Sequence, residues 1–457
     1  MQIVFQLPAL RFRFAHIVPM LFREGSELPI TNYQSPILTQ HATRTTPNPW
    51  QYNQAMIFPG KHLLLGVTGS IAAFKAADLA SKLAQAGALV DVILTSGAEK
   101  FVTPLTFQSV TGRRAFTDAD LWGGEAHVLH VGLAGAADAL VIAPCTANTL
   151  AKLAHGLADN LLTITALANR APLVLAPAMD GGMYDAPATQ ANLATLLGRG
   201  ATVIGPADGH LASGLSGRGR MLEPTEIIGH LRLVLGRGGL LAGKKVVISA
   251  GGTQEPLDPV RVLTNRSSGK QGYALAQAAL DAGAQVTLVS APTSLTPPVG
   301  AQLVHAETAR QMLEAVLAES SDADALVMAA AIADFRPKLS APGKMKKRDG
   351  IPQLTLEATE DVLEAAARAR SGKKRPRVVV GFAAESQNLL ANASEKLKSK
   401  KLDFIVANDI SASDAGFGAE TNRVTLLFAD GKQEILPLMS KAEVAEIIVA
   451  RIAALLE

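Results

Sequence analysis

A short run of small, hydroxyl-bearing and basic residues has the composition of a phosphate-binding turn. Residues 265–272 read Asn-Arg-Ser-Ser-Gly-Lys-Gln-Gly, between a strand-like run at 245–249 and a helical pattern at 273–280. Backbone N–H groups at a helix N-terminus attract anions, and Lys270 adds a full positive charge. The run fits neither the Walker A motif nor the G-x-G-x-x-G fingerprint. A helix start capped by serine therefore explains it equally well.

Strand-like and helical segments alternate around this run through most of the chain. The strand-like runs cover residues 62–67, 89–94, 139–143, 173–176, 202–204, 245–249, 285–289, 302–305, 325–329, 377–380, 404–406 and 424–428. Helical patterns lie between them, among them 72–86, 147–153, 192–198 and 227–235. This alternation predicts an α/β fold with doubly wound parallel sheets, in which ligands bind beyond the carboxyl ends of the strands.

The length of 457 residues favours two domains rather than one. We predict domains at 60–235 and 244–457, joined by a glycine-rich linker at 236–243. Residues 1–59 contain repeated prolines and no sustained periodicity. They are either a poorly ordered extension or the product of a start site assigned too early, and we favour the second because Met56 directly precedes the first strand. We expect little fixed structure there in both cases.

Composition excludes several classes of protein. A net charge of +3 gives no reason to expect a nucleic-acid partner. No run of about 18 apolar residues is present, so no membrane-spanning helix is expected. The single cysteine, Cys145, excludes an intramolecular disulfide and a cysteine-based structural zinc site. We therefore expect a cytoplasmic protein.

Residues 252–261 and 264–270 closely resemble the ligase half of the bifunctional coenzyme A biosynthesis family, the phosphopantothenoylcysteine decarboxylase/phosphopantothenate–cysteine ligases. The resemblance covers residues 243–450 and implies a Rossmann-like ligase domain. It implies that CTP activates phosphopantothenate as an acyl-cytidylate and that the amine of cysteine then displaces CMP. Such a site needs phosphate donors and a divalent cation, Mg²⁺ or Mn²⁺, whose ligands we do not assign.

The same resemblance implies roles for individual residues. Asn265 would act on the acyl-cytidylate, Lys344 would stabilise charge at the acyl-transfer centre, and Asp334 would accept a hydrogen bond from the cytosine amino group. The residues expected to bind CTP are Ser267, Ser268, Lys270, Met328, Ala329, Ala330, Asp334, Lys344, Thr359, Glu360, Asp361, Val362, Phe382, Lys396 and Lys400. Core packing of Phe382 is the alternative, as is a solvated helix face for Lys396 and Lys400, which lie one turn apart. Thr359 and Glu360 depart from the family, which usually has Asn-Pro there.

Motifs in the first half resemble the flavin-dependent cysteine decarboxylases. They lie at 66–75, 95–98, 130–133, 143–149, 156–162, 176–180 and 214–221. The resemblance covers residues 60–225 and implies a flavodoxin-like fold, FMN as the cofactor and His130 as the catalytic histidine. The residues expected to bind FMN are Gly69, Ser70, Ile71, Thr95, Ser96, Thr146, Asn148 and Met179. A histidine that satisfies a backbone group is the alternative for His130.

Two positions depart from the decarboxylase family. Asp180 replaces the usual Asn, and an ionised Asp cannot donate a hydrogen bond to the substrate carboxylate. Ser213 stands where the mobile flap usually carries an acidic cysteine, and a hydroxyl is a far poorer proton donor than a thiol. A water, or an Asp180 kept protonated by burial, could replace that acid. Arg218 could neutralise Asp180 or hold the substrate carboxylate, and Cys145 is interpreted as a packing residue.

We therefore predict a bifunctional enzyme with small-molecule substrates. One alternative retains the ligase and loses complete decarboxylation through Asp180 and Ser213. The others are a pyridine-nucleotide oxidoreductase, although the chain lacks its glycine fingerprint, and a non-catalytic flavin-binding subunit. The resemblance also implies a homo-oligomer, since trimeric decarboxylase domains and dimeric ligase domains in one chain can close into a dodecamer with flavin sites at subunit boundaries.

Overall fold

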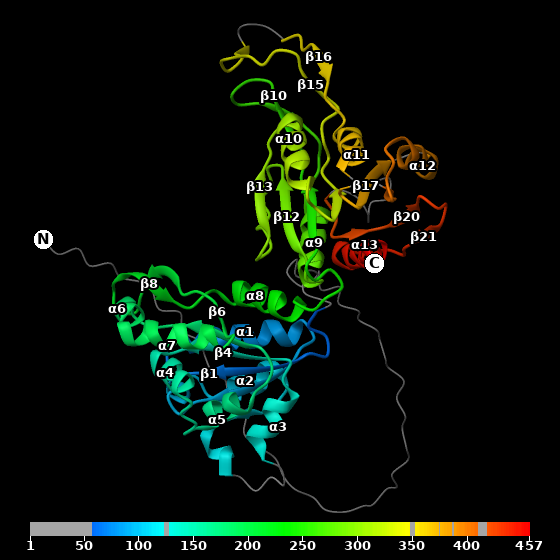
Figure 1. Cartoon of the computed structure of the whole chain (residues 1–457). Helices are drawn as coiled ribbons and strands as arrows, with labels where there is room; N and C mark the ends of the chain where they lie inside the picture. Colours follow the sequence, from blue (N-terminus) through cyan, green and yellow to red (C-terminus); the bar gives the residue numbers. More distant parts are fainter. Residues whose placement is uncertain (1–56, 123–127, 348–351, 374, 386–387, 410–417) are drawn as a thin grey trace, which may run out of the picture. The chain divides into compact units, whose positions relative to one another are not determined.

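The computed structural model describes residues 57–122, 128–347, 352–373, 375–385, 388–409 and 418–457 (Figure 1). Most of the predicted extension at 1–59 thus lies outside the described residues. Phe58 falls within them and is fully buried in the core of the first domain. The packed part of that domain therefore includes residues before 60.

The sheet of the first domain has six parallel strands in the order β3-β2-β1-β4-β5-β6. The strands are β1 (His62–Val67), β2 (Leu89–Leu94), β3 (Ala115–Phe116), β4 (Ala139–Cys145), β5 (Leu173–Pro177) and β6 (Thr202–Val203). Strand β3 is a two-residue edge strand. Without it, the order is that of flavodoxin-like sheets, which confirms the predicted fold of this domain.

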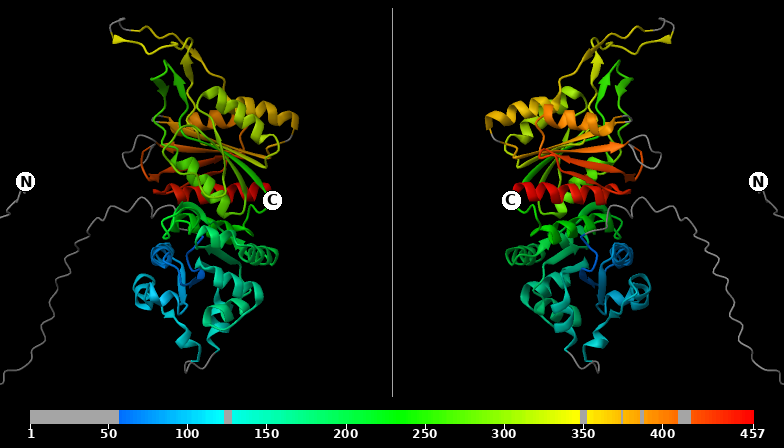
Figure 2. Two further views of the ribbon diagram at one scale, coloured as in Figure 1. Left: turned by 90° about the vertical axis from the view of Figure 1, so that its left-hand side faces the viewer. Right: turned by 90° about the vertical axis from the view of Figure 1, so that its right-hand side faces the viewer.

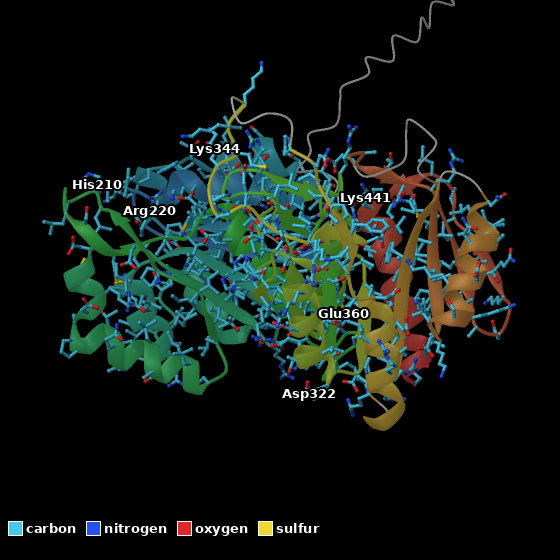
Figure 3. All side chains as sticks on the ribbon, turned by 90° about the horizontal axis from the view of Figure 1, so that it is seen from above. His210, Arg220, Asp322, Lys344, Glu360 and Lys441 are labelled. Atoms are coloured by element: carbon cyan, nitrogen blue, oxygen red, sulfur yellow. The ribbon has the colours of Figure 1, made fainter. Side chains whose placement is uncertain are left out.

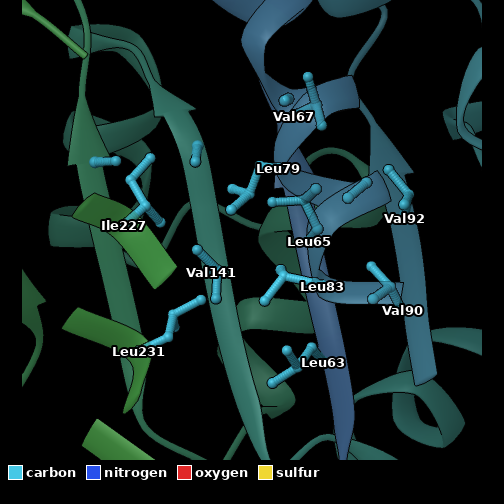
Figure 4. Close-up of a cluster of buried hydrophobic side chains, with 14 of the residues drawn as sticks. Leu63, Leu65, Val67, Leu79, Leu83, Val90, Val92, Val141, Ile227 and Leu231 are labelled. Carbon is cyan, nitrogen blue, oxygen red and sulfur yellow. The ribbon is translucent and has the colours of Figure 1, made fainter. Parts of the chain in front are cut away.

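Helices cover both faces of this sheet because successive residues of a strand point to opposite sides. Leu63 and Val67 of β1 pack in the same core as Leu79 and Leu231, as Figure 4 shows, whereas Leu64 belongs to the core on the other face. The helices are α1 (Ala73–Gln85), α2 (Pro104–Thr111), α3 (Leu129–Ala136), α4 (Ala147–His155), α5 (Leu161–Ala168), α6 (Gly181–Asp185), α7 (Pro187–Gly198) and α8 (Pro224–Gly236). A hairpin of β7 (Ala207–His210) and β8 (Ser216–Arg220) stands apart from the sheet.

The second domain has an eight-stranded sheet in the order β13-β12-β9-β14-β17-β18-β20-β21. The strands are β9 (Lys245–Ala250), β12 (Gln285–Ser290), β13 (Gln302–His305), β14 (Ala325–Met328), β17 (Val378–Glu385), β18 (Phe404–Asp409), β20 (Val424–Phe428) and β21 (Gln433–Ile435). The first six strands in this order are parallel, as predicted. Strand β20 runs antiparallel to its neighbour β18, and β21 runs antiparallel to β20. A short turn joins β20 to β21, and such a turn can connect only antiparallel neighbours.

Within the described residues, five helices and three two-stranded sheets complete the second domain. Helices α9 (Lys270–Asp281) and α13 (Lys441–Leu456) share one core, and α10 (Ala309–Ser320), α11 (Val362–Lys373) and α12 (Leu389–Ser399) share the other (Figure 2). The small pairs are β10 (Gln254–Pro256) with β11 (Val262–Thr264), β15 (Phe335–Pro337) with β16 (Leu356–Ala358), and β19 (Thr421–Asn422) with β22 (Met439–Ser440). None of the helices in the described part of the chain is long and apolar enough to cross a membrane.

Candidate active sites

The turns that follow β1, β2 and β4 meet at the carboxyl edge of the first sheet. A Cβ atom on Gly69 would lie 3.0 Å from the backbone of Gly97, so the first two turns are in direct contact. The Thr68 hydroxyl donates to the carbonyl of Pro144 at 2.8 Å and accepts from the backbone N–H of Thr146 at 3.1 Å. One buried threonine therefore holds the turn after β1 against the turn after β4.

Most of the residues predicted to bind FMN belong to these turns. Gly69 and Ser70 follow β1, Thr95 and Ser96 follow β2, and Thr146 caps α4 by accepting a hydrogen bond from Thr149. The other three are Ile71, Asn148 and Met179, which lie before α1, in α4 and after β5. The turns thus present small residues and hydroxyl groups at the place where parallel sheets bind ligands.

A pocket of about 370 Å³ lies beside these turns. Its lining comes from the start of α1, the turn after β5 and the β7–β8 hairpin, and includes Ser70, Ile71, Lys75, Met179, Asp180, His210, Ser213 and Arg220. His210 and Arg220 project from the hairpin, as Figure 3 shows. Lys75 and Arg220 both bind Glu223, each at 2.7 Å, so the two cations share one carboxylate.

The two departures from the decarboxylase family, Asp180 and Ser213, contact each other. The Ser213 hydroxyl donates to Asp180 Oδ2 at 2.7 Å, and Asp180 Oδ1 accepts from the N–H of Gly182 at 3.0 Å. These two hydrogen bonds hold the pKa of the Asp180 carboxyl below its usual value. Burial therefore does not keep Asp180 protonated in this chain, because the two hydrogen bonds lower the pKa by more than partial desolvation raises it.

The hairpin that carries Ser213 is pinned to the turn after β5. The N–H of Met179 donates to the carbonyl of Gly219 at 3.0 Å. Gly219 has φ +148°, and a Cβ atom there would lie 2.1 Å from the carbonyl oxygen of Met179. Only glycine fits this contact. Arg218 is exposed and is not among the pocket-lining residues, and neither hydrogen bond that lowers the Asp180 pKa comes from it.

His130 and Cys145 lie outside the pocket lining. His130 is half-buried in the first turn of α3, where the neighbouring Val128 and Val131 are 59% and 54% exposed. The single chain thus does not bring His130 to the pocket. Cys145 is fully buried in the core of β4, and burial raises the pKa of its thiol, as expected for a packing residue.

In the second domain, the run at 265–272 leads into an exposed helix start. Gly269 occupies the N-cap of α9 with φ +77°, and no side chain caps the helix. A Cβ atom on Gly272 would lie 2.5 Å from the Cβ of Ala250, so α9 packs directly on β9. The serine-capped helix start is thus not what forms here. The N–H groups of the first turn of α9 remain available to an anion.

This helix start opens onto a pocket of about 810 Å³. Nine residues predicted to act in the ligase site lie in its lining, namely Asn265, Ser267, Ser268, Lys270, Ala329, Ala330, Asp334, Phe382 and Lys396. Phe382 also packs against the core, so its core packing is confirmed, and its contact with a nucleotide stays a prediction. Lys396 donates to the carbonyl of Phe382 at 3.1 Å, which places its ammonium group at the pocket rather than on a solvated helix face.

A network of hydrogen bonds shapes the loop that carries Asp334. Asn265 Nδ2 donates to the carbonyls of Ala331 and Ile332 at 3.3 and 3.1 Å. Because carbonyls only accept, the remaining polar atom of Asn265 is its Oδ1. Thr253, which is fully buried, accepts from the N–H of Ala333 at 2.9 Å through its hydroxyl. Hydrogen bonds to Thr253 and Asn265 therefore hold the backbone of this loop in place.

Several predicted residues are not in this pocket lining. Met328 and Val362 are buried in the core. Lys344 is in neither pocket lining. Thr359 and Glu360 line a separate pocket of about 530 Å³, although Thr359 donates to the backbone carbonyls of Ala333 and Asp334 at 2.6 and 2.9 Å. Figure 3 marks Lys344 and Glu360.

Lys400 lies with Asp361 outside the pocket lining. Its ammonium group binds Asp361 at 2.9 Å and Glu364 at 3.3 Å. The spacing of one turn predicted that Lys396 and Lys400 share a direction, but only Lys396 lines the pocket, because Asp361 before α11 and Glu364 on α11 bind Lys400.

The predicted ligase site omitted five polar side chains of the pocket lining: Arg266, Gln271, Asn408, Asn422 and Lys441. Asn408 belongs to a stretch that supported the resemblance, but no role was assigned to it. Lys441 begins α13, directly after the capping box formed by Ser440 and Glu443. Ser-x-x-Glu marks a helix start in a sequence, yet nothing in the pattern indicates that this start faces a pocket.

Two family models match the chain. The model described as Flavoprotein matches residues 54–235, and the DNA/pantothenate metabolism flavoprotein C-terminal domain matches residues 241–456. The coenzyme A biosynthesis bifunctional protein CoaBC of Bacillus subtilis is 46% identical over 398 residues, which cover 86% of this chain and 97% of the relative. That of Vibrio vulnificus is 43% identical over 397 residues, covering 87% and 98%.

Among solved structures, the C-terminal domain of CoaBC is 39% identical with a TM-score of 0.41, covering 48% of this chain and 98% of that domain. The curated relatives match both halves of the chain over nearly their whole length. The chain therefore belongs to the coenzyme A biosynthesis bifunctional proteins, enzymes that combine a decarboxylase with a ligase.

Proposed function

We propose that the second domain joins 4′-phosphopantothenate to cysteine at the expense of CTP, and that the first domain decarboxylates the resulting 4′-phosphopantothenoylcysteine with FMN to 4′-phosphopantetheine. The observation that carries the ligase half is the pocket in which the uncapped start of α9, Lys270, Lys396 and the loop of Asp334 meet. It combines N–H and ammonium groups that can bind phosphate oxygens with a hydrogen-bond acceptor suited to a cytosine amino group.

The ligase reaction proceeds in two balanced steps. A carboxylate oxygen of phosphopantothenate attacks the α-phosphorus of CTP, forming the acyl-cytidylate and releasing pyrophosphate. The amine of cysteine then attacks the acyl carbon, forming the amide, and CMP leaves with the electron pair of the broken C–O bond. The start of α9 with Lys270 and Lys396 would hold phosphate oxygens in both steps. Asn265 would present its Oδ1 to the reacting groups, since its Nδ2 is used by the loop.

A divalent cation would accompany the triphosphate. The described residues contain no group of three or more His, Cys, Asp or Glu side chains that could hold a metal ion. Mg²⁺ commonly keeps several waters and binds through substrate phosphates. We therefore propose that Mg²⁺ or Mn²⁺ enters with CTP and is held mainly by phosphate oxygens and water. Lys344 would act on the acyl-transfer centre only if its segment moves toward the pocket.

The cradle after β1, β2 and β4 fits FMN. Its donor set consists of backbone N–H groups and the hydroxyls of Ser70, Thr95 and Ser96, and the contact of Gly69 with Gly97 leaves no room for a Cβ atom. When bound, FMN supplies the two-electron oxidation of the substrate carbon that bears the thiol. Asp180, Ser213 and the hairpin would enclose the cysteine end of the substrate.

A second outcome for the decarboxylase is favoured by one observation. Loss of CO₂ leaves an enethiol, and its reduction to phosphopantetheine would need the two electrons held by the reduced flavin, returned as a hydride, together with a proton on the other carbon. Ser213 donates its hydroxyl hydrogen to an ionised Asp180, and neither group is an effective acid near neutral pH. The second candidate is thus a working ligase joined to a decarboxylase that stops at the enethiol.

We further propose that the chain acts as a homo-oligomer, a dodecamer by family resemblance, in the cytoplasm. His130 lies outside the pocket lining of its own chain, beside the exposed Val128 and Val131. A subunit contact over α3 would bury these side chains and could bring His130 to a neighbouring flavin site. Light scattering of the purified protein tests this, and a monomer would contradict it.

One assay separates these possibilities. Purified protein receives phosphopantothenate, cysteine, CTP and Mg²⁺, and CMP, pyrophosphate, CO₂ and the final product are measured by mass. Equal amounts of CMP and phosphopantetheine would support the full reaction. CO₂ with an enethiol would support the second candidate, and absence of CTP-dependent CMP release would refute the ligase proposal.

A further inference from the structure

Lys441 occupies an unfavourable position for a cation. It is the first residue of α13 and only 6% exposed, although it lines the ligase pocket. Burial disfavours an ammonium ion, and so does the partial positive charge of a helix N-terminus. A buried lysine in such a place is expected where an anion compensates its charge. Figure 3 marks its position in the second domain.

A second cation faces the same part of the pocket from another helix. Lys270, the first residue of α9, forms an ion pair with Glu420 and donates to the carbonyl of Gly418 at 3.1 Å. Lys441 donates to the carbonyl of Ala419 at 2.5 Å. Residues 418–420 therefore supply oxygen atoms to both lysines. The starts of α9 and α13 and two ammonium groups converge on one wall.

Side-chain amides fix the two helix starts to each other. Gln271 Nε2 donates to the backbone carbonyl of Lys441 at 3.1 Å, and Asn422 Nδ2 donates to Gln271 Oε1 at 3.2 Å. A carbonyl only accepts, so this chain of hydrogen bonds sets the orientation of both amides. Asn422 Oδ1 is left as a buried acceptor with no partner in the described part of the chain, as is Asn408 Oδ1.

These orphan oxygens indicate a site built for a polar ligand. Asn422 and Asn408 are 1% and 8% exposed, and both line the pocket. A buried polar atom without a partner is costly, so a bound molecule, its hydration water or its counterion would be expected to satisfy it. A phosphate with a bound metal ion or ordered water would suit both kinds of group. The lysines would bind the phosphate oxygens, and the asparagine oxygens would bind the metal ion or accept from the water.

We propose that Lys441 acts together with Lys270 as a phosphate-binding residue of the ligase site. The inference rests on the proposed ligase function and adds a residue to it. The phosphate oxygens would belong either to the triphosphate of CTP or to the 4′-phosphate of phosphopantothenate. In both cases they would compete with the Glu420 carboxylate for Lys270.

This assignment has a consequence for protons. Burial, and then the charge of Lys270, lower the pKa of Lys441 to about 8, while Glu420 acts in the opposite direction. The other nearby acid, Glu443 on α13 itself, is engaged in the Ser440 cap. A bound anion favours the charged form of Lys441 and raises its pKa. Above pH 8, binding should therefore take up a proton.

The test uses full-length protein and calorimetric titration with pyrophosphate, CTP and phosphopantothenate at pH 8.5. Two buffers of different ionisation enthalpy reveal the proton uptake. Lys441→Met removes the charge and Lys441→Arg keeps it, and Lys398→Met on the exposed face of α12 is the control. We expect Lys441→Met to weaken pyrophosphate binding at least tenfold and to abolish proton uptake. Lys441→Arg should bind pyrophosphate but take up no proton, because a guanidinium stays charged.

The arms of the experiment identify the phosphate. Weaker binding of CTP alone would assign Lys441 to the triphosphate, and weaker binding of phosphopantothenate alone would assign it to the 4′-phosphate. Wild-type affinity of Lys441→Met for all three ligands would overturn the inference. Calorimetric melting of the second domain, with a melting temperature equal to that of the wild type, checks that the Lys441→Met variant is folded. A wild-type protein that binds pyrophosphate but does not release CMP from CTP would instead refute the proposed ligase.

Discussion

Replacing Thr253 by valine should weaken CTP binding without touching any residue that contacts the nucleotide. Thr253 is fully buried, and its hydroxyl oxygen accepts from the N–H of Ala333, next to Asp334. Valine has nearly the same shape but no acceptor. The N–H of Ala333 would then lose its partner inside the protein, at a cost of about 1–3 kcal/mol.

That free energy has two readouts. If the loop leaves its position to hydrate the N–H group, the apparent affinity for CTP falls by roughly 5- to 150-fold, since about 1.4 kcal/mol corresponds to a factor of ten. If the loop stays, the melting temperature of the domain falls by about 2–4 °C per kcal/mol. The KM for CTP, followed by pyrophosphate release, and calorimetric melting measure the two.

Two controls come with this design. Thr253→Ser keeps the acceptor and loses only a methyl group, so it should retain a KM for CTP close to that of the wild type. Decarboxylation of added phosphopantothenoylcysteine by Thr253→Val should be unchanged, because that reaction belongs to the other domain. Wild-type KM and melting temperature for Thr253→Val, or equal damage from Thr253→Ser, would refute the role given to the hydroxyl.

Three further predictions concern the decarboxylase. Thr68→Val removes the hydroxyl that joins the turns after β1 and β4, so FMN should be lost more readily on dilution, which flavin fluorescence measures; retention equal to the wild type would contradict this. Gly219→Ala places a Cβ atom against the carbonyl of Met179 and should abolish decarboxylation while CTP-dependent ligation persists; an active decarboxylase would show that the hairpin contact is dispensable. Ser213→Cys alone places a thiol beside the ionised Asp180, which raises the pKa of the thiol. The double variant Ser213→Cys, Asp180→Asn should therefore raise the fraction of product released as phosphopantetheine by more than the sum of the two single changes. Mass spectrometry measures this fraction, and a double variant equal to that sum would disprove the coupling.

The positions of the main strands followed from the sequence. Apolar runs separated by helical patterns are a local property, and each buried parallel strand carries its own signal. The edge strands were harder to predict. Strand β3 has two residues, and the antiparallel strand β21 has three, two of them exposed. Short exposed strands contain too few apolar residues to produce a periodic pattern.

Strand β17 illustrates a different limit. The predicted strand ended at Val380, but the strand continues to Glu385. Gly381 fits there because a Cβ atom would lie 2.7 Å from the side chain of Leu402. The glycine reflects close packing and not a turn, and only the neighbour in space distinguishes the two.

The sequence by itself identified the chemistry, because motifs such as the run at 265–272 are contiguous and specific enough to recognise. Only the tertiary structure decided which side chains meet. It joined Ser213 to Asp180 across 33 positions of the chain, separated Lys400 from Lys396, and brought Lys441 to Lys270 from another helix. Hydrogen bonds and Coulomb interactions act over a few ångströms of space, whatever the separation along the chain. Residues far apart in the sequence therefore become partners only once the sheets and helices are packed.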